Sequence, residues 1–309
     1  MPLSSVISLL IIVVGLPSFC RIFRRSRQAI RGTTLVSAWW WSWWAFLMWT
    51  LSYMGDHVFN SLSKPVADHL WYGAAVLGLC PLIAVLGSRR PGSRVWTWFI
   101  QIPLLLVLEW PVFSLWLQGT EIRGLELESP HLVGYIMVLI MGVGNYFGTR
   151  FTFSGITYGS ACSLLVISTS ASCPWWLADR WSVRLWATCL MMLALMLIDR
   201  GNLKQPMKVD RFDRLWLDFF DTFGVVWGRR IQDRINIIAE KEDWPVRLAL
   251  NGFTWSTSRS SESVRVATEL RMEHAFRWLF RRFVDRSWVD ERLGSVAGES
   301  VDRVLPLDS

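Results

Sequence analysis

Hydrophobic and polar positions are distributed unevenly along this 309-residue chain. As far as residue 200, long apolar runs alternate with short polar segments, and each run approaches the ~20 residues that an α-helix needs to cross a bilayer. Residues 1–200 are therefore expected to form a polytopic helical membrane domain. The pattern predicts about seven transmembrane helices, at Leu3–Cys20, Thr34–Gly55, Leu70–Gly87, Val95–Gln118, Leu132–Gly148, Phe153–Ser172 and Val183–Ile198.

Beyond residue 200 charged residues become frequent, and the pattern is that of a small folded module. After a linker at 201–209, aromatic residues recur every three or four positions from Phe212 to Trp227, which predicts one apolar face on a helix that reaches Lys241. This face either packs inside the module or lies on anionic lipid. Packing is preferred, because acidic residues on the same helix oppose attraction to lipid.

The rest of the module is predicted to contain a hairpin and a second long helix. Apolar residues alternate from Val246 to Leu250, then Asn251-Gly252 and two aromatic residues follow, which indicates a β-hairpin. The next helix ends at about Val284. The fold class is thus mainly α, with an α+β module over about 210–294 and a frayed end after it. The core side of the last helix is expected to carry Val264, Ala267, Ala275, Trp278 and Leu279.

The second predicted span shows how the membrane domain is oriented. Ala38–Gly55 contains six tryptophans and no charged residue, and five arginines occur in the preceding segment, Arg21–Arg31. Five of the tryptophans lie within Trp39–Trp44, which is more than one helical turn, so they point in too many directions to line one ligand site. Tryptophans at a helix end are typical of the bilayer interface, and we interpret them as an anchor.

Lysine and arginine are concentrated in alternate loops of this arrangement. The set of loops that includes Arg21–Arg31 carries nine basic residues, and the opposing set carries four. Basic loops face the cytoplasm. The pattern therefore predicts a plasma-membrane protein with its N-terminus outside the cell and its C-terminus in the cytoplasm.

Charge and cysteine content exclude several classes of protein. Basic residues outnumber acidic ones mainly before residue 199, thirteen against seven, so the excess belongs to membrane-flanking arginines and a nucleic-acid-binding surface is not expected. The five cysteines lie in or beside apolar runs without any CxxC pair, which argues against a disulfide framework or a zinc module. No nucleotide-binding or catalytic motif occurs, so no cofactor is predicted and an enzyme is not favoured. The expected partners are the bilayer and a protein at the C-terminal module, and the oligomeric state stays open.

Glu109 is the only acidic residue deep inside a predicted span. The hydrocarbon region disfavours its charge, so such a carboxyl group is expected to be neutral or paired. Pro103 and Pro111 lie on either side of it, and a proline-broken helix beside a buried acid is typical of a transport or proton-relay site. In the alternative interpretation Glu109 has a packing role and satisfies a carbonyl that Pro111 leaves free.

Two Asp-His pairs, Asp56-His57 and Asp68-His69, border the predicted loop between the second and third helices. His131 is predicted on the same, outer side of the membrane. Carboxylate and imidazole groups can together bind a metal or transfer protons, and two histidines can hold a haem. No recognised ligand spacing is present, so the alternative is that these are ordinary residues at helix ends.

Small residues predict close packing of the fifth and sixth spans. Glycine lets two helix backbones approach closely in a membrane, although glycine is also common in membrane helices generally. The residues concerned are Gly144, Gly148, Gly155 and Gly159.

Three functions are compatible with these patterns. We favour an interaction, assembly or sensing protein that presents its C-terminal module in the cytoplasm, because the module resembles a folded unit and no catalytic motif occurs. The alternative is a small-solute or ion transporter that works through Glu109. The third is a membrane enzyme or redox protein with a histidine site on its outer face.

Overall fold

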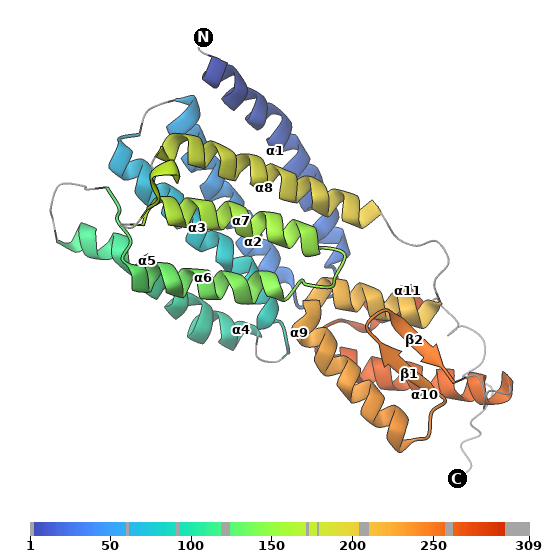
Figure 1. The fold of residues 1–309 in the computed structure, drawn as a ribbon. Coiled ribbons are helices and arrows are strands. Elements are labelled where there is room, and N and C mark those ends of the chain that lie inside the picture. Colours follow the sequence, from blue (N-terminus) through green and yellow to red (C-terminus); the bar gives the residue numbers. More distant parts are fainter. Residues whose placement is uncertain are drawn as a thin grey trace. The chain divides into compact units, whose positions relative to one another are not determined.

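The computed structural model is mainly helical and contains one small two-stranded sheet (Figure 1). The chain divides into two compact units, one of Met1–Ile30 with Leu35–Gln205 and the other of Arg31–Thr34 with Pro206–Ser309. The division near residue 205 lies where the residue pattern changes. The structure describes residues 3–59, 62–90, 93–118, 124–170, 173–177, 179–203, 210–256 and 262–293.

The first unit consists of helices. They are α1 Leu3–Ala29, α2 Val36–Tyr53, α3 Lys64–Leu86, α4 Ser93–Trp96, α5 Ile102–Leu117, α6 Ser129–Gly144, α7 Thr152–Ser168 and α8 Arg180–Leu203. Short π-helical turns, Met54–Val58 and Thr97–Gln101, follow α2 and precede α5, and a 3₁₀ turn spans Trp175–Leu177.

Three helical stretches among the described residues are long and apolar enough to cross a membrane: Lys64–Leu86, Thr97–Leu117 and Arg180–Gly201. The helices α6 and α7 are also apolar but shorter. By length and composition the first unit is therefore compatible with a membrane domain.

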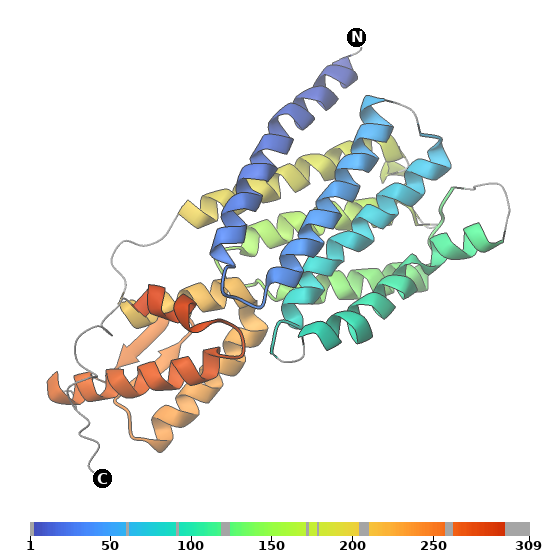
Figure 2. The ribbon, with the colours of Figure 1, turned by 180° about the vertical axis from the view of Figure 1, so that it is seen from behind.

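α3 is the most deeply buried of the three long apolar helices. Side chains from three neighbouring segments donate hydrogen bonds to its backbone carbonyl groups: Gln101 at 3.0 Å, Tyr135 at 3.0 Å and Tyr158 at 2.6 Å. A buried polar group must find a partner because water cannot reach it. These bonds fix α3 at the centre of the unit, where α2 runs beside it (Figure 2).

α1 is longer than the sequence predicts, because the arginine-rich segment continues the helix to Ala29. Arg21 and Arg25 are four residues apart and so share one helix face. Both bind Asp199 near the end of α8, at 3.1 and 2.8 Å. The cytoplasmic loop predicted for these arginines is thus mostly helix.

The tryptophan cluster of α2 has two environments. Trp39 and Trp43 pack against Phe23 of α1, with ring centroids 4.1 and 5.1 Å away, whereas Trp40 and Trp44 are exposed. The interpretation of the whole cluster as an interface anchor therefore needs correction, since part of it joins α1 to α2.

The second unit contains α9 Arg211–Lys241, β1 Val246–Ala249, β2 Gly252–Trp255, α10 Glu262–Phe280 and α11 Arg286–Leu293. The predicted hairpin is confirmed, and its strands are antiparallel with Val246 opposite Trp255. Gly252 has a φ of 129°, and a Cβ on it would lie 2.6 Å from Oδ1 of Asp213. That oxygen accepts a hydrogen bond from the Phe253 amide at 2.7 Å. Glycine is thus required where the hairpin meets α9.

An aromatic core joins α9 to α10 and α11. The predicted aromatic face of α9 is buried, but the helix is broken at Gly224, where φ is 78°. The predicted core side of α10 is wrong in part, because Val264, Ala267 and Trp278 are exposed. The buried aromatic residues of the unit include Phe212, Trp216, Phe219, Phe223, Phe276, Phe280, Phe283 and Trp288.

A short segment between α1 and α2 completes the second unit. Thr33 forms an antiparallel bridge with Val284, and both residues are buried. The Thr34 amide donates to the Phe283 carbonyl at 2.8 Å, and the Asp285 amide donates to the Gly32 carbonyl at 2.6 Å. The sequence does not predict this pairing.

Parts of three predicted segments lie outside the described residues. They are the linker at 204–209, the serine-rich turn at 257–261 and the frayed end at 294–309. The first residues of the predicted linker, 201–203, belong to α8.

Candidate functional site

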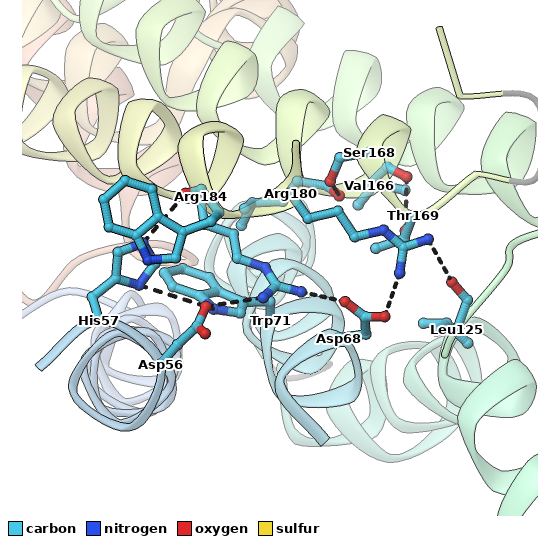
Figure 3. A network of polar contacts seen from close by, with 12 residues as sticks. Asp56, His57, Asp68, Trp71, Leu125, Val166, Ser168, Thr169, Arg180 and Arg184 are labelled. Carbon is cyan, nitrogen blue, oxygen red and sulfur yellow. Dashed lines mark hydrogen bonds and ion pairs between the residues drawn. The ribbon is translucent and has the colours of Figure 1, made fainter. Parts of the chain in front are cut away.

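The clearest polar site of the first unit lies where α2, α3 and α8 bring acidic and basic residues together (Figure 3). Asp56 and His57 lie on the π-helical turn that continues α2, and Asp68 lies in α3. Arg180 and Arg184 are four residues apart at the start of α8, on one helix face. Both Asp-His pairs are therefore helical, whereas the sequence predicts them in a loop.

Arg184 bridges the two aspartates. Its Nη1 lies 2.9 Å from Oδ2 of Asp56, and its Nη2 binds Oδ1 of Asp68. Arg180 binds the other carboxylate oxygen of Asp68 and donates to the Leu125 carbonyl at 3.4 Å. Asp68 is only 3% exposed and Arg184 only 6%. Two positive and two negative charges thus neutralise one another in a largely buried network.

Aromatic side chains close the Asp56 end of this network. The indole nitrogen of Trp71 donates to Oδ2 of Asp56 at 2.9 Å. The His57 ring stacks between Tyr53 and Trp181, at centroid distances of 4.7 and 5.1 Å. Its Nε2 lies 3.3 Å from the Trp181 carbonyl, and since a carbonyl can only accept, this nitrogen carries the proton.

The protonation state of His57 follows from its burial. Desolvation lowers its pKa below the ordinary value of a histidine and outweighs the opposing attraction of Asp56. His57 is therefore neutral at pH 7, and the charge balance of the network depends on the aspartates and arginines.

His69 and His131, the other two histidines that the sequence predicts on the outer side, do not join the network. Nδ1 of His69 accepts a hydrogen bond from the Trp116 indole at 3.1 Å, and His131 lies in the first turn of α6. In the part of the chain that the structure describes, no cluster of three or more His, Cys, Asp or Glu side chains is arranged to hold a metal ion. The structure thus gathers Asp56 and Asp68 on arginine instead of assembling the five predicted ligands.

Arg180 and Arg184 are the functional residues that sequence analysis missed. Both are counted with the basic residues of the outer loops, although the predicted span Val183–Ile198 contains Arg184, and the structure places both in α8. Their four-residue spacing, opposite two aspartates in neighbouring helices, is the signal that could have identified an ion-pair network. Chemically, the network joins three helices and leaves no carboxylate oxygen of Asp68 without an arginine.

Glu109 has a different environment. It lies in α5, and its Oε1 is 3.6 Å from the point that a Cβ on Gly73 of α3 would occupy. It forms no hydrogen bond or ion pair with another residue that the structure describes. The nearby Leu108 carbonyl accepts a hydrogen bond from Tyr72 at 2.5 Å. Tyr72 thus binds the backbone next to this acid, whereas the carbonyl that Pro111 leaves free is that of Val107, four residues before it.

The four predicted packing glycines also separate into two pairs. A Cβ on Gly159 of α7 would lie 3.1 Å from a methyl carbon of Val143 in α6, and a Cβ on Gly155 would lie 3.7 Å from the same side chain. No heavy atom lies within 4 Å of the corresponding points on Gly144 and Gly148. Close approach of the two helices thus involves the glycines of α7.

Comparisons with other proteins add no identification. No family model matches the chain, and neither a curated protein nor a solved structure is significantly similar to it. The functional assignment therefore depends on the residues and contacts described above.

Proposed function

We propose that this is an integral protein of the plasma membrane that senses or assembles with a partner through its second unit. It crosses the membrane seven times, with its N-terminus outside and its C-terminal module in the cytoplasm. The observation that carries this proposal is the pairing of Thr33 and Thr34 with Phe283 and Val284. The short segment between the first two spans is thereby part of the module's own fold.

This pairing supports a coupling role for a physical reason. The module is connected to the membrane domain covalently after α8 and by hydrogen bonds to the segment between α1 and α2. A conformational change that moves α1 against α2 changes the strain on that pairing, so two states of the membrane domain are expected to favour different states of the module. A partner bound to the module would shift the same equilibrium in the reverse direction.

The ion-pair network at the other ends of the helices supports this assignment. Its charges balance and its aspartates are already bound, so it favours a role in stability over catalysis or ion binding.

Photo-crosslinking in intact cells tests the proposed role of the module. A photoreactive amino acid would replace Leu250 or Ile237, which are exposed apolar residues of the second unit. We expect a discrete protein adduct from at least one position, and its yield should fall when Gly252→Ala disturbs the hairpin. Absence of any adduct from a correctly folded protein would refute partner binding at these surfaces.

Reporter fusions test the topology separately. A reporter after Ser309 should be active only if it is a cytoplasmic type, and a reporter after Leu62 only if it is an external type. The reverse pattern would contradict the number of spans and the assignment of the module to the cytoplasm.

Transport is the second candidate function, and Glu109 is the observation that favours it. An acid in a candidate span without a hydrogen-bond or ion-pair partner among the described residues can bind a proton or a cation. Glu109→Gln keeps the size of the side chain and removes its charge. Loss of solute or proton flux in vesicles, with unchanged folding, would favour transport over the sensing or assembly role, and unchanged flux would exclude Glu109 as its carrier.

A further inference from the structure

The outward face of α10 is apolar and basic at once. Val266 is 56% exposed, Leu270 65% and Trp278 49%, and these residues are separated by four and eight positions. Positions four apart lie on one side of a helix, so the three side chains form a stripe about 18 Å long at 1.5 Å per residue. The opposite side of α10 carries the core residues Met272, Phe276 and Phe280.

Positive charge borders this stripe. Arg271, Arg281 and Arg282 are exposed, and the guanidinium of Arg281 lies over the Trp278 ring, 5.2 Å from its centroid. α10 has three acidic residues: Glu262 is exposed at the first position of the helix, and Glu269 and Glu273 are neutralised. Their arginine partners are Arg211 and Arg265 for Glu269, and Arg277 for Glu273.

Apolar side chains next to arginines that form no ion pair with a described residue are complementary to an anionic lipid surface. A helix that lies in the membrane plane buries its apolar face below the headgroups, while arginines bind lipid phosphate and tryptophan lies at the interface. A protein partner would also cover the stripe, but none of the three arginines forms an ion pair with a described residue, which favours a uniformly negative surface.

The connection to the membrane domain brings a bilayer within reach of α10. Phe283 follows Arg282 directly and accepts the amide hydrogen of Thr34, which is two residues before α2 begins. Two residues span at most about 7 Å. The turn directly after α10, where Arg281 and Arg282 lie, is therefore tied to the start of a helix that we assign to the membrane.

We infer that α10 is a lipid-docking helix. Its exposed residues Val266, Leu270, Arg271 and Trp278, with Arg281 and Arg282 in the turn that follows, bind the anionic surface of the membrane that the protein spans. This inference goes beyond the proposed function, because it needs no protein partner. The sequence suggests lipid binding only for α9, as the less favoured role of its aromatic face, whereas the inference assigns lipid binding to α10.

Full-length protein in lipid nanodiscs tests this inference. The native cysteines are replaced by serine, and Leu270→Cys carries an environment-sensitive fluorophore. Discs contain either zwitterionic phosphatidylcholine or a mixture with 30% phosphatidylglycerol, with and without a quencher-labelled lipid. Ile237→Cys is the matched control, since Ile237 is an exposed apolar residue of α9 in the same unit.

Docking predicts quenching at position 270 in the anionic discs, little quenching in the zwitterionic discs, and none at position 237. Replacing the three arginines by glutamine should weaken docking roughly 100-fold, since each arginine near an anionic surface contributes about a fivefold factor. Quenching in these discs should then fall to the zwitterionic level.

Three results would overturn the inference. They are absence of quenching at position 270 in both lipids, equal quenching at positions 270 and 237, and quenching that ignores both lipid charge and the arginine substitutions. A fluorescence change at position 270 without quencher lipid, which grows with the number of protein copies per disc, would identify a second copy as the occupant instead. The photo-crosslinking experiment at Leu250 and Ile237 does not depend on lipid binding by α10. A negative result in the nanodiscs would therefore refute lipid docking without refuting partner binding.

Discussion

Replacement of Arg184 by methionine should destabilise the first unit strongly. The guanidinium binds both Asp56 and Asp68, and methionine keeps much of the side-chain volume without the charge. Removing one partner of a buried ion pair costs about 3–5 kcal/mol, because the remaining charge stays buried without compensation. Arg180 still binds Asp68, and Trp71 still donates to Asp56, so we expect the lower end, about 3 kcal/mol.

Thermal unfolding in detergent can measure this cost through the buried thiols. Cys80 and Cys162 are buried in the first unit, so a thiol-reactive dye should reach them only on unfolding. Replacing the other cysteines by serine removes their background signal. A loss of about 3 kcal/mol corresponds to a fall in Tm of roughly 6–12 °C for a domain of this size.

A second substitution separates charge compensation from packing. Asp56→Asn combined with Arg184→Met leaves one positive and one negative charge, Arg180 and Asp68, so the double variant should recover part of the lost stability. Interaction energies within such a network reach about 0.5–3 kcal/mol. A stable Arg184→Met protein, or a double variant that loses the sum of the two single losses, would refute the bridging role of Arg184.

Substitutions at Gly252, Asp213 and Gly159 test other parts of the structure, and Gly144 provides a control. Gly252→Ala should open the hairpin, because a Cβ there would lie 2.6 Å from Asp213, and faster amide hydrogen exchange in Val246–Trp255 would reveal it. Asp213→Ala removes the acceptor of the Phe253 amide and should cost about 1 kcal/mol. Asp213→Asn keeps an acceptor and should cost little at pH 7. Burial raises the pKa of Asp213, so protonation favours the folded form, and wild-type stability should rise relative to the Asn variant as pH falls. Gly159→Leu should separate α6 from α7 and lower the Tm, whereas Gly144→Leu, which meets no neighbour, should leave it nearly unchanged.

Local patterns in the sequence predict much of the second unit. The aromatic spacing of α9 identifies its buried face, and Asn251-Gly252 identifies the hairpin, because both signals depend only on residues that are close in sequence. The break at Gly224 and the outward position of Trp278 were not predicted. Both depend on how the helices pack, which periodicity within one helix does not determine.

The candidate site was only partly predictable for a related reason. Both Asp-His pairs are recognisable from the sequence, yet their partners, Arg180 and Arg184, follow more than a hundred residues later. Arg180 precedes the predicted span Val183–Ile198 and Arg184 lies at its start, so the pattern does not show that both belong to one face of α8. Thr33 and Val284 are even further apart in the sequence. Their segments pair through backbone hydrogen bonds, so no side-chain pattern predicts the contact.

The proposed coupling of the two units depends on the pairing of Thr33 with Val284, and an engineered disulfide can detect this pairing. The hydrogen bonds lie on the residues flanking this pair, so it is a non-hydrogen-bonded antiparallel pair with Cα atoms about 4.5 Å apart, within the range for a disulfide. In a chain without native cysteines, Thr33→Cys with Val284→Cys should crosslink within the native membrane under mild oxidation. Thr33→Cys with Ile237→Cys serves as the control and should not crosslink. Rapid crosslinking of the first pair alone is the predicted result, whereas no crosslink, or equal crosslinking of both pairs, would contradict the account.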